Sequence, residues 1–499
     1  MDVFDNLALG FAAALTPMNL LFCLVGALIG TLVGVLPGIG PAGTIALLLP
    51  ITYYMSPLTA LIMLAGIYYG AQYGGSTTAI LIKLPGESSS VVTTLDGHAM
   101  ARKGRAGAAL AIAALVSFFA GTVSTVLLAV ASPPLSALAL RFSAPEYFAL
   151  MVFGLIGAVV LAQGSLIKAV AMVLLGLLMG LTGTDLNSGQ QRFTFGIAEL
   201  ADGINFVTLA IGVFGITEIL INLEQQVTRK LDAVIGRLWP TREEARAAAP
   251  AALRGTAIGA ILGVLPGGGA LLSAFAAYTV EKKLARDPSR FGNGAVEGLA
   301  APEAANNAGA QTSFIPLLTL GIPFNPVMAL MIGAMTVFGI TPGPGVITNQ
   351  PELFWGVVAS MWIGNLMLII INLPLIGMWV QLLKVPYRLL APSILLVCSI
   401  GVYSLNNSPF EVGLAALFGL MGYAFHKFGC EPAPLLLGFI LGPLMEENLR
   451  RALLLSRGDP MIFIERPISL GLLILSAALL VLVLMPAIGR AREAAFREE

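Results

Sequence analysis

Charged residues are scarce in this chain of 499 residues, since only 11% are Asp, Glu, Lys or Arg and 57% are hydrophobic. Soluble domains carry about a quarter charged residues. The composition therefore predicts an integral membrane protein with little soluble mass, surrounded by a lipid bilayer. The formal net charge is zero and no long block of one sign occurs, which argues against nucleic acid as a partner.

Cysteine, histidine and catalytic motifs are equally sparse. The three cysteines lie far apart in or beside apolar runs, and the two histidines are also far apart. Neither a disulfide framework nor a metal centre other than bound sodium is expected. No HExxH, GxSxG or GxxxxGK[ST] motif occurs. The sequence therefore predicts neither an enzyme nor an organic cofactor, and no ATP-driven motor within this chain.

Apolar runs predict the fold class. Several runs reach the length of about 20 residues that crosses a bilayer, and others are shorter or interrupted. The N-terminal MDVFDNLALGF has two aspartates and no Lys or Arg, so we expect the first apolar segment to be retained and not cleaved as a signal peptide. We predict an all-α polytopic membrane protein with about ten to fourteen transmembrane segments.

Basic residues mark the side expected to face the cytoplasm. They gather at residues 102–105, 229–254 and 282–290 and in the C-terminal tail at 490–497. Four good apolar runs separate the first two loops, an even number that lets both loops face the same side.

An internal repeat follows from a proline and glycine motif that occurs twice. GTLVGVLPGIG begins at Gly30, and GAILGVLPGGG begins 229 positions later at Gly259. Downstream, GGSTTAI at 74–80 resembles GAQTSFI at 309–315. Proline and glycine are poor helix residues, so each copy is expected to hold interrupted elements.

The flanking charges favour an inverted repeat. The second motif has basic residues on both sides, which predicts a re-entrant hairpin with both ends in the cytoplasm, while the first motif has none. This is the plan of many secondary transporters; a single long crossing helix from Leu7 is the alternative for the first copy. The expected parts are a first half 1–224 (hairpin 18–55, broken helix 57–86, scaffold helices 106–223), a cytoplasmic linker 225–252, a second half 253–460 (hairpin 253–280, broken helix 297–322, helices 325–445) and a C-terminal helix with a cytoplasmic tail 461–499.

The glycine motifs can form a binding site or a packing kink. Irregular backbone at membrane depth is tolerated where it lines a watered cavity or is buried in protein. Free N–H groups at the start of one half-helix favour an anion, and free carbonyls at the end of the other favour a cation. Small residues also let helices pack closely. The matched copies favour the binding site.

Polar residues follow each motif where a lipid-facing helix would be apolar. They are Gln72, Ser76, Thr77, Thr78, Glu303, Asn306, Asn307, Gln311, Thr312 and Ser313. Polar groups inside a membrane usually face a partner or a pathway, and hydrogen bonding between helices is the alternative. Glu303 either couples a cation or proton or lies at the water interface, and Lys83 either pairs with an anion or snorkels to the interface.

The same residues carry a resemblance to a known family. The segments YYGAQYGGSTTAILIKLPGE, TTLDGHAMARKGRAG and APEAANNAGAQTSFIPLLTLGIP, with the two glycine motifs, resemble the large membrane subunit (TctA) of the tripartite tricarboxylate transporters. The resemblance implies a secondary transporter of the bacterial inner membrane, similar to the elevator-type ion-transporter superfamily and often dimeric. It further implies a periplasmic solute-binding protein (TctC-like), a small membrane subunit (TctB-like), and uptake of carboxylates such as citrate with Na⁺ or H⁺.

Residues and resemblance together predict one mechanism, in which an anion and its cations bind between the two halves. Expected substrate ligands are Gly38, Gly40, Ser76, Thr77, Thr78, Gly267, Gly268, Gly269, Thr312 and Ser313. Expected ion-coupling residues are Pro37, Gln72, Pro266, Glu303, Asn306 and Asn307. A transporter that needs no binding protein is the runner-up, followed by an intramembrane enzyme and a channel.

Overall fold

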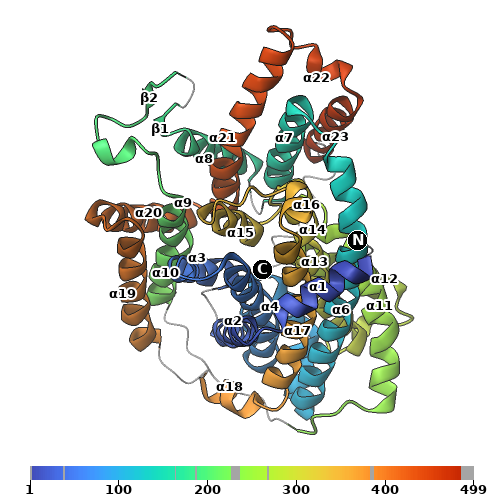
Figure 1. Cartoon of the computed structure of the whole chain (residues 1–499). Helices are drawn as coiled ribbons and strands as arrows, with labels where there is room; N and C mark the ends of the chain where they lie inside the picture. Colours follow the sequence, from blue (N-terminus) through green and yellow to red (C-terminus); the bar gives the residue numbers. More distant parts are fainter. Residues whose placement is uncertain are drawn as a thin grey trace.

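The computed structural model describes residues 3–36, 40–162, 165–185, 188–225, 236–266, 269–382 and 387–484 (Figure 1). This part of the chain is almost wholly helical, as the composition predicts. Its only strands form one short antiparallel hairpin, in which β1 (Gly183–Thr184) pairs with β2 (Gln191–Arg192).

The elements of the first half, up to residue 225, are α1 Val3–Ala14, α2 Pro17–Val35, α3 Gly40–Thr52, α4 Pro57–Ile82, η1 Ser88–Val91, α5 Thr93–Met100, η2 Ala101–Arg105, α6 Ala106–Ala139, α7 Ala144–Leu161, α8 Leu166–Gly180, η3 Ala198–Leu200, α9 Phe206–Ala210, η4 Ile211–Ile216 and α10 Thr217–Gln225. The later elements are α11 Arg242–Gly263, α12 Gly269–Leu284, η5 Pro288–Arg290, α13 Val296–Thr312, α14 Phe314–Leu320, α15 Pro326–Val337, α16 Gly345–Asn349, α17 Pro351–Asn372, α18 Ile376–Leu382, α19 Tyr387–Asn406, α20 Pro409–Lys427, α21 Pro432–Leu455, α22 Ile462–Glu465 and α23 Pro467–Leu484.

Four helical stretches of the described chain are long and apolar enough to cross a membrane. They are Pro17–Val35, Thr93–Ala139, Phe206–Glu224 and Pro351–Asn372. Several more apolar helices are shorter, such as α3 and α15. These helices indicate a membrane protein, and the expected ten to fourteen crossings stay a prediction.

Both glycine motifs interrupt a helix where the sequence predicts it. The first motif separates α2 from α3, and the second separates α11 from α12. Gly40 and Gly269 start the second helices with φ of +64° and +41°, a backbone conformation that side chains disfavour. Pro37, Gly38, Gly267 and Gly268 lie outside the described residues.

The arms of the second motif fold back on each other. Arg254 on α11 donates from Nε to Oε1 of Glu281 on α12 at 2.5 Å. This ion pair joins points well before and well after the break, as expected for a hairpin. Which side of the membrane the hairpin enters stays a prediction.

A ridge of three glycines brings the first arm of each motif against a polar helix. A Cβ on any of them would lie 2.2–2.5 Å from a backbone carbonyl oxygen of that helix, so only glycine fits. On α2 the glycines are Gly26, Gly30 and Gly34, against Met63, Ile67 and Ala71 of α4; on α11 they are Gly255, Gly259 and Gly263, against Ala301, Ala305 and Gly309 of α13. The packing of the two copies therefore matches, while their opposite orientation stays a prediction.

The two polar helices differ in continuity. α13 ends at Thr312 and α14 continues after Ser313, so the second polar element is interrupted near the expected place. α4 runs unbroken from Pro57 to Ile82, contrary to the expected broken helix 57–86. The hydroxyls of Ser76 and Thr77 donate to backbone carbonyls one turn earlier, at 3.0 and 3.2 Å. These bonds satisfy the polar side chains without a break in the helix.

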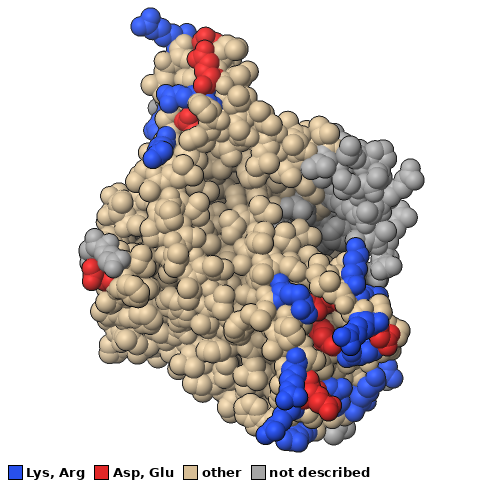
Figure 2. All heavy atoms as spheres, turned by 90° about the vertical axis from the view of Figure 1, so that its right-hand side faces the viewer, with Lys and Arg blue, Asp and Glu red and all other residues tan. Residues whose placement is uncertain are grey.

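Three basic loops meet at one end of the molecule. Lys103 Nζ donates to the carbonyl of Asn293 at 2.6 Å, and Arg105 pairs with Glu244. Asp96 Oδ1 accepts N–H groups of Gly292 (3.0 Å) and of the two residues 294–295 (2.7 Å each). Figure 2 shows Lys and Arg gathered toward two ends of the visible face, with a broad surface almost free of charge between them.

Candidate functional site

Glu303 forms the centre of a buried polar cluster. Its side chain is on α13 and the residue is 1% exposed. Ser76 on α4 donates to Oε2 at 2.8 Å, Thr93 on α5 donates to Oε1, and Ser117 on α6 lies 3.5 Å from Oε2. Glu303 therefore lies inside the protein and not at the water interface.

Two amides extend the cluster along α13. Asn307 Nδ2 donates to Ser117 Oγ at 2.8 Å and to Asn306 Oδ1 at 2.6 Å. Asn306 is fully buried, and its side-chain amide lies beside the Glu303 carboxylate. Both amides therefore belong to the polar cluster around Glu303.

A second buried carboxylate, Glu87, joins the first polar element. Gln72 Oε1 accepts a hydrogen bond from Ser89 Oγ at 2.8 Å, and Ser89 also donates to the carboxylate of Glu87 through its hydroxyl and, at 3.0 Å, through its backbone N–H. Glu87 is 8% exposed. Sequence reasoning did not select this residue, although it ends the LPGE segment that follows the polar stretch of α4.

A cavity of about 10 Å³ lies beside Glu303. That is about the space one water molecule needs. Its polar lining comes from four helices, with Tyr73, Ser76 and Thr77 on α4, Ser117 on α6, Glu303 on α13 and Asn372 on α17. Asn372 is 6% exposed and its Oδ1 accepts no hydrogen bond, although its Nδ2 donates to the Leu368 carbonyl at 2.9 Å.

Other predicted ligands bond to the backbone. Thr78 Oγ1 donates to the carbonyl of Val35 at 2.8 Å, at the end of α2. Thr312 donates to the Ala308 carbonyl at 3.0 Å, and Ser313 to the Ala310 carbonyl at 2.7 Å. All three hydroxyls therefore donate to backbone carbonyls and not to the Glu303 carboxylate. Their expected role in substrate binding stays a prediction.

The second glycine motif faces an unpaired donor. A Cβ on Gly269 would lie 3.9 Å from Asn325 Nδ2, and this nitrogen is buried without a partner. Pro266 is buried, and a Cβ on Gly157 of α7 would lie 2.1 Å from its side chain. The start of α12 therefore combines a helix N-terminus with a free amide donor, both of which suit an anion.

The formal charge in the core of the described chain is negative. Glu87 and Glu303 are buried, whereas no described lysine or arginine is. Lys83 is exposed and ends α4 in the left-handed conformation, so it does not point into this cluster. In the described part of the chain, no three His, Cys, Asp or Glu side chains gather to hold a metal ion.

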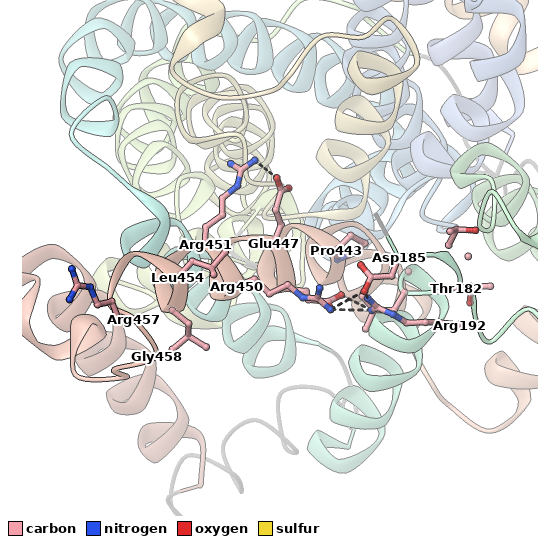
Figure 3. Close-up of a pocket in the computed structure, with 16 residues that line it drawn as sticks. Thr182, Asp185, Arg192, Pro443, Glu447, Arg450, Arg451, Leu454, Arg457 and Gly458 are labelled. Atoms are coloured by element: carbon pink, nitrogen blue, oxygen red, sulfur yellow. Dashed lines mark hydrogen bonds and ion pairs between the residues drawn. The ribbon is translucent and has the colours of Figure 1, made fainter. Parts of the chain in front are cut away.

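A much wider cavity, of about 850 Å³, lies elsewhere, between the β-hairpin and the end of α21 (Figure 3). Arg192 bonds there to Glu446 at 2.9 Å and to Asp185 at 2.5 Å, and these acidic partners raise its pKa. Arg450 bonds to the same two carboxylates. Because no predicted ligand lines this cavity, we place the candidate site at the buried cluster.

Comparison with protein families places most of the chain in a known family model. Residues 20–437 match the model of the tripartite tricarboxylate transporter TctA family. The matched segment contains both glycine motifs, both polar helices and the buried cluster.

Two similar proteins come from Agrobacterium vitis. One, described as an uncharacterized 52.8 kDa protein in the TAR-I ttuC' 3' region, is 59% identical over 500 residues, covering both chains completely. The other, an uncharacterized protein in the TAR-II ttuC' 3' region, is 59% identical over 241 residues, which are 48% of this chain and all of that one. No solved structure was found to match the chain.

Proposed function

Because the chain belongs to the tripartite tricarboxylate transporter TctA family, we propose that it is the membrane permease of a secondary transporter that imports a carboxylate with cations. Family membership makes it a component of a tricarboxylate transporter. Our proposal adds that the anion binds near the two glycine motifs and that Na⁺ or H⁺ accompanies it across the bacterial inner membrane.

The charge of the buried cluster is the observation that carries the cation coupling. Glu87 and Glu303 are buried, and no described Lys or Arg is buried with them. Like charges in a medium of low dielectric repel strongly, so two ionised carboxylates in the core oppose the entry of a further anion. Cations or protons that bind with the substrate remove this repulsion, so that substrate and cation bind together.

Donors for the anion are available at the second motif. α12 is a helix of 16 residues that starts at Gly269, and its first N–H groups favour negative charge. The free amide of Asn325 lies beside this start. We assign a substrate carboxylate to this place, with the start of α3 at Gly40 as its counterpart in the first half.

Partners follow from the family. TctA proteins act in tripartite systems with TctB and TctC partners. We propose that a TctC-like binding protein delivers the carboxylate to the end that bears β1 and β2, away from the three basic loops. A TctB-like subunit would complete the membrane complex.

Uptake into proteoliposomes tests the proposal. The chain is reconstituted with its two partner subunits, and uptake of mono-, di- and tricarboxylates is compared under sodium, proton and no gradients. We expect accumulation of at least one carboxylate only when a cation gradient is present. Accumulation by the chain without the binding protein would favour the runner-up, and downhill flux that no cation gradient changes would refute coupling.

A further inference from the structure

We propose that the small cavity beside Glu303 is a sodium site whose ligands come from Ser76, Thr77, Ser117, Glu303 and Asn372. This inference rests on the proposed function for its role in transport. It adds two residues, on α6 and α17, that the sequence did not indicate, and it selects the coupling ion.

The polar lining of the cavity consists of oxygen atoms that suit a hard cation. Glu303 supplies a carboxylate, and Ser76, Thr77 and Ser117 supply hydroxyls. Tyr73 lines the same cavity, but its hydroxyl donates to Asn365 at 2.8 Å. Hard cations take carboxylate, carbonyl and other oxygen ligands, and no lysine or arginine lines this cavity to compete with one.

The free oxygen of Asn372 is independent support for a bound cation. Its Nδ2 is engaged with the Leu368 carbonyl at 2.9 Å and lies 3.5 Å from Thr31 Oγ1, whereas Oδ1 has no donor. A buried acceptor without a partner costs about 1–3 kcal/mol. A cation in the cavity satisfies this oxygen, whereas a proton carried by Glu303 satisfies only the carboxylate.

Charge and size select a monovalent ion. The cavity has one carboxylate, Glu303, so an ion of charge +1 neutralises it, whereas a divalent ion leaves an excess charge in the protein interior. The space of about 10 Å³ suits a single small ion. The ligands come from helices on both sides of residues 226–235, so a bound ion links both halves of the chain.

Sodium binding to the purified full-length chain tests the site directly. We expect NaCl, compared with choline chloride and KCl at equal ionic strength, to raise the midpoint of thermal unfolding, and ²²Na⁺ to bind saturably. Asn372→Leu and Ser117→Ala should weaken sodium binding about tenfold or more. Ser132→Ala is the matched control, because Ser132 is a buried serine of the same helix α6 that does not line the cavity.

A second variant, which changes the ion selectivity of the site, tests the proposal if Asn372→Leu fails to fold. Asn372→Asp places a second carboxylate at the cavity, so we expect it to gain stabilisation by CaCl₂ that the wild type lacks. The site is refuted if sodium does not stabilise the wild type, or if sodium stabilises Ser117→Ala as it does the wild type and Asn372→Asp gains no stabilisation by CaCl₂.

Uptake assays on the same preparations separate the two proposals. Carboxylate uptake driven by a pH gradient without any dependence on sodium would refute the sodium site and leave the transport function standing. Sodium binding that Ser117→Ala weakens, together with no uptake of any carboxylate, would support the site and refute the proposed function.

Discussion

The neighbouring hydroxyls of Thr77 and Thr78 on α4 make different contacts. Thr77 lines the cavity beside Glu303, and its hydroxyl bonds only within its own helix, to Tyr73. The hydroxyl of Thr78 instead reaches the Val35 carbonyl in the last turn of α2. Both residues are threonines, so their positions around the helix decide that Thr77 is a candidate ligand and that Thr78 has a structural role.

Thr78→Val is expected to destabilise the protein more than Thr77→Val. The first substitution leaves the Val35 carbonyl without its side-chain donor, at a cost of about 1–3 kcal/mol. Thermal unfolding of both variants in sodium-free buffer measures the difference, with sodium omitted because Thr77 is a proposed ligand. Equal unfolding midpoints would contradict these assignments.

Two substitutions of Glu87 distinguish the contribution of its charge to stability from that of its hydrogen bonds. Glu87→Gln keeps an acceptor for the Ser89 N–H and hydroxyl, so we expect this variant to fold. Glu87→Leu leaves the Ser89 N–H buried without its acceptor, at about 1–3 kcal/mol, while the Ser89 hydroxyl keeps Gln72 Oε1, so this variant should lose stability. Yield of monodisperse protein after size-exclusion chromatography compares the two; similar yields would show that the hydrogen bonds of Glu87 are dispensable.

The sequence indicates part of the cluster for a physical reason. Runs of polar residues stand out in apolar surroundings, so Ser76, Glu303 and Asn307 could be selected. Ser117 and Asn372 each have apolar neighbours on both sides within a long apolar run. Ser117 bonds to Asn307 across 190 positions of sequence, and no local pattern encodes such a contact.

At the scale of elements, the glycine ridges decide how the arms meet the polar helices. The sequence predicted the helix breaks at Gly40 and Gly269, because those positions carry the residues that tolerate positive φ. It did not predict the continuity of α4, because a cluster of hydroxyls and glycines has low helix propensity that tertiary packing overrides. The same glycines serve as contact surface for α2, and this role depends on a partner far away in sequence.

Gly259→Ala should therefore destabilise the fold strongly, although it adds only one methyl group. Its Cβ would lie 2.2 Å from the Ala305 carbonyl oxygen, so α11 and α13 must separate. Gly413→Ala on α20 is the control, because a Cβ there meets nothing within 4 Å and alanine favours a helix by about 0.5–1 kcal/mol. Chromatography of fluorescent fusions should show folded protein for Gly413→Ala and little for Gly259→Ala; equal profiles would contradict the close packing.

At the scale of the whole molecule, charged side chains gather at two ends (Figure 2). The loops at 102–105, 236–246 and 282–290 share one end, and the β-hairpin with the end of α21 lies at another (Figures 1 and 2). The sequence predicted that these loops share a side, because charge is excluded from the membrane interior. It did not predict the charged hairpin, whose ion pairs with α21 span more than 250 positions.

Labelling with a membrane-impermeant maleimide tests the orientation. In a chain whose three native cysteines are replaced, Ser188→Cys between β1 and β2 and Ser289→Cys in a basic loop are both exposed sites. We expect reagent added outside spheroplasts to label Ser188→Cys and to label Ser289→Cys only after lysis. Labelling of Ser289→Cys in intact spheroplasts would reverse the proposed orientation.

The contacts of Asp96 have a consequence for motion. This residue lies on α5, in the first half. It accepts hydrogen bonds from the N–H groups of Gly292, Gly294 and Ala295 and from the hydroxyl of Tyr278, all in the second half. Four hydrogen bonds to one carboxylate therefore connect α5 to α12 and to the loop before α13, at the end of the molecule that bears the basic loops. Any movement of one half against the other would have to break these four hydrogen bonds and leave a buried carboxylate without donors.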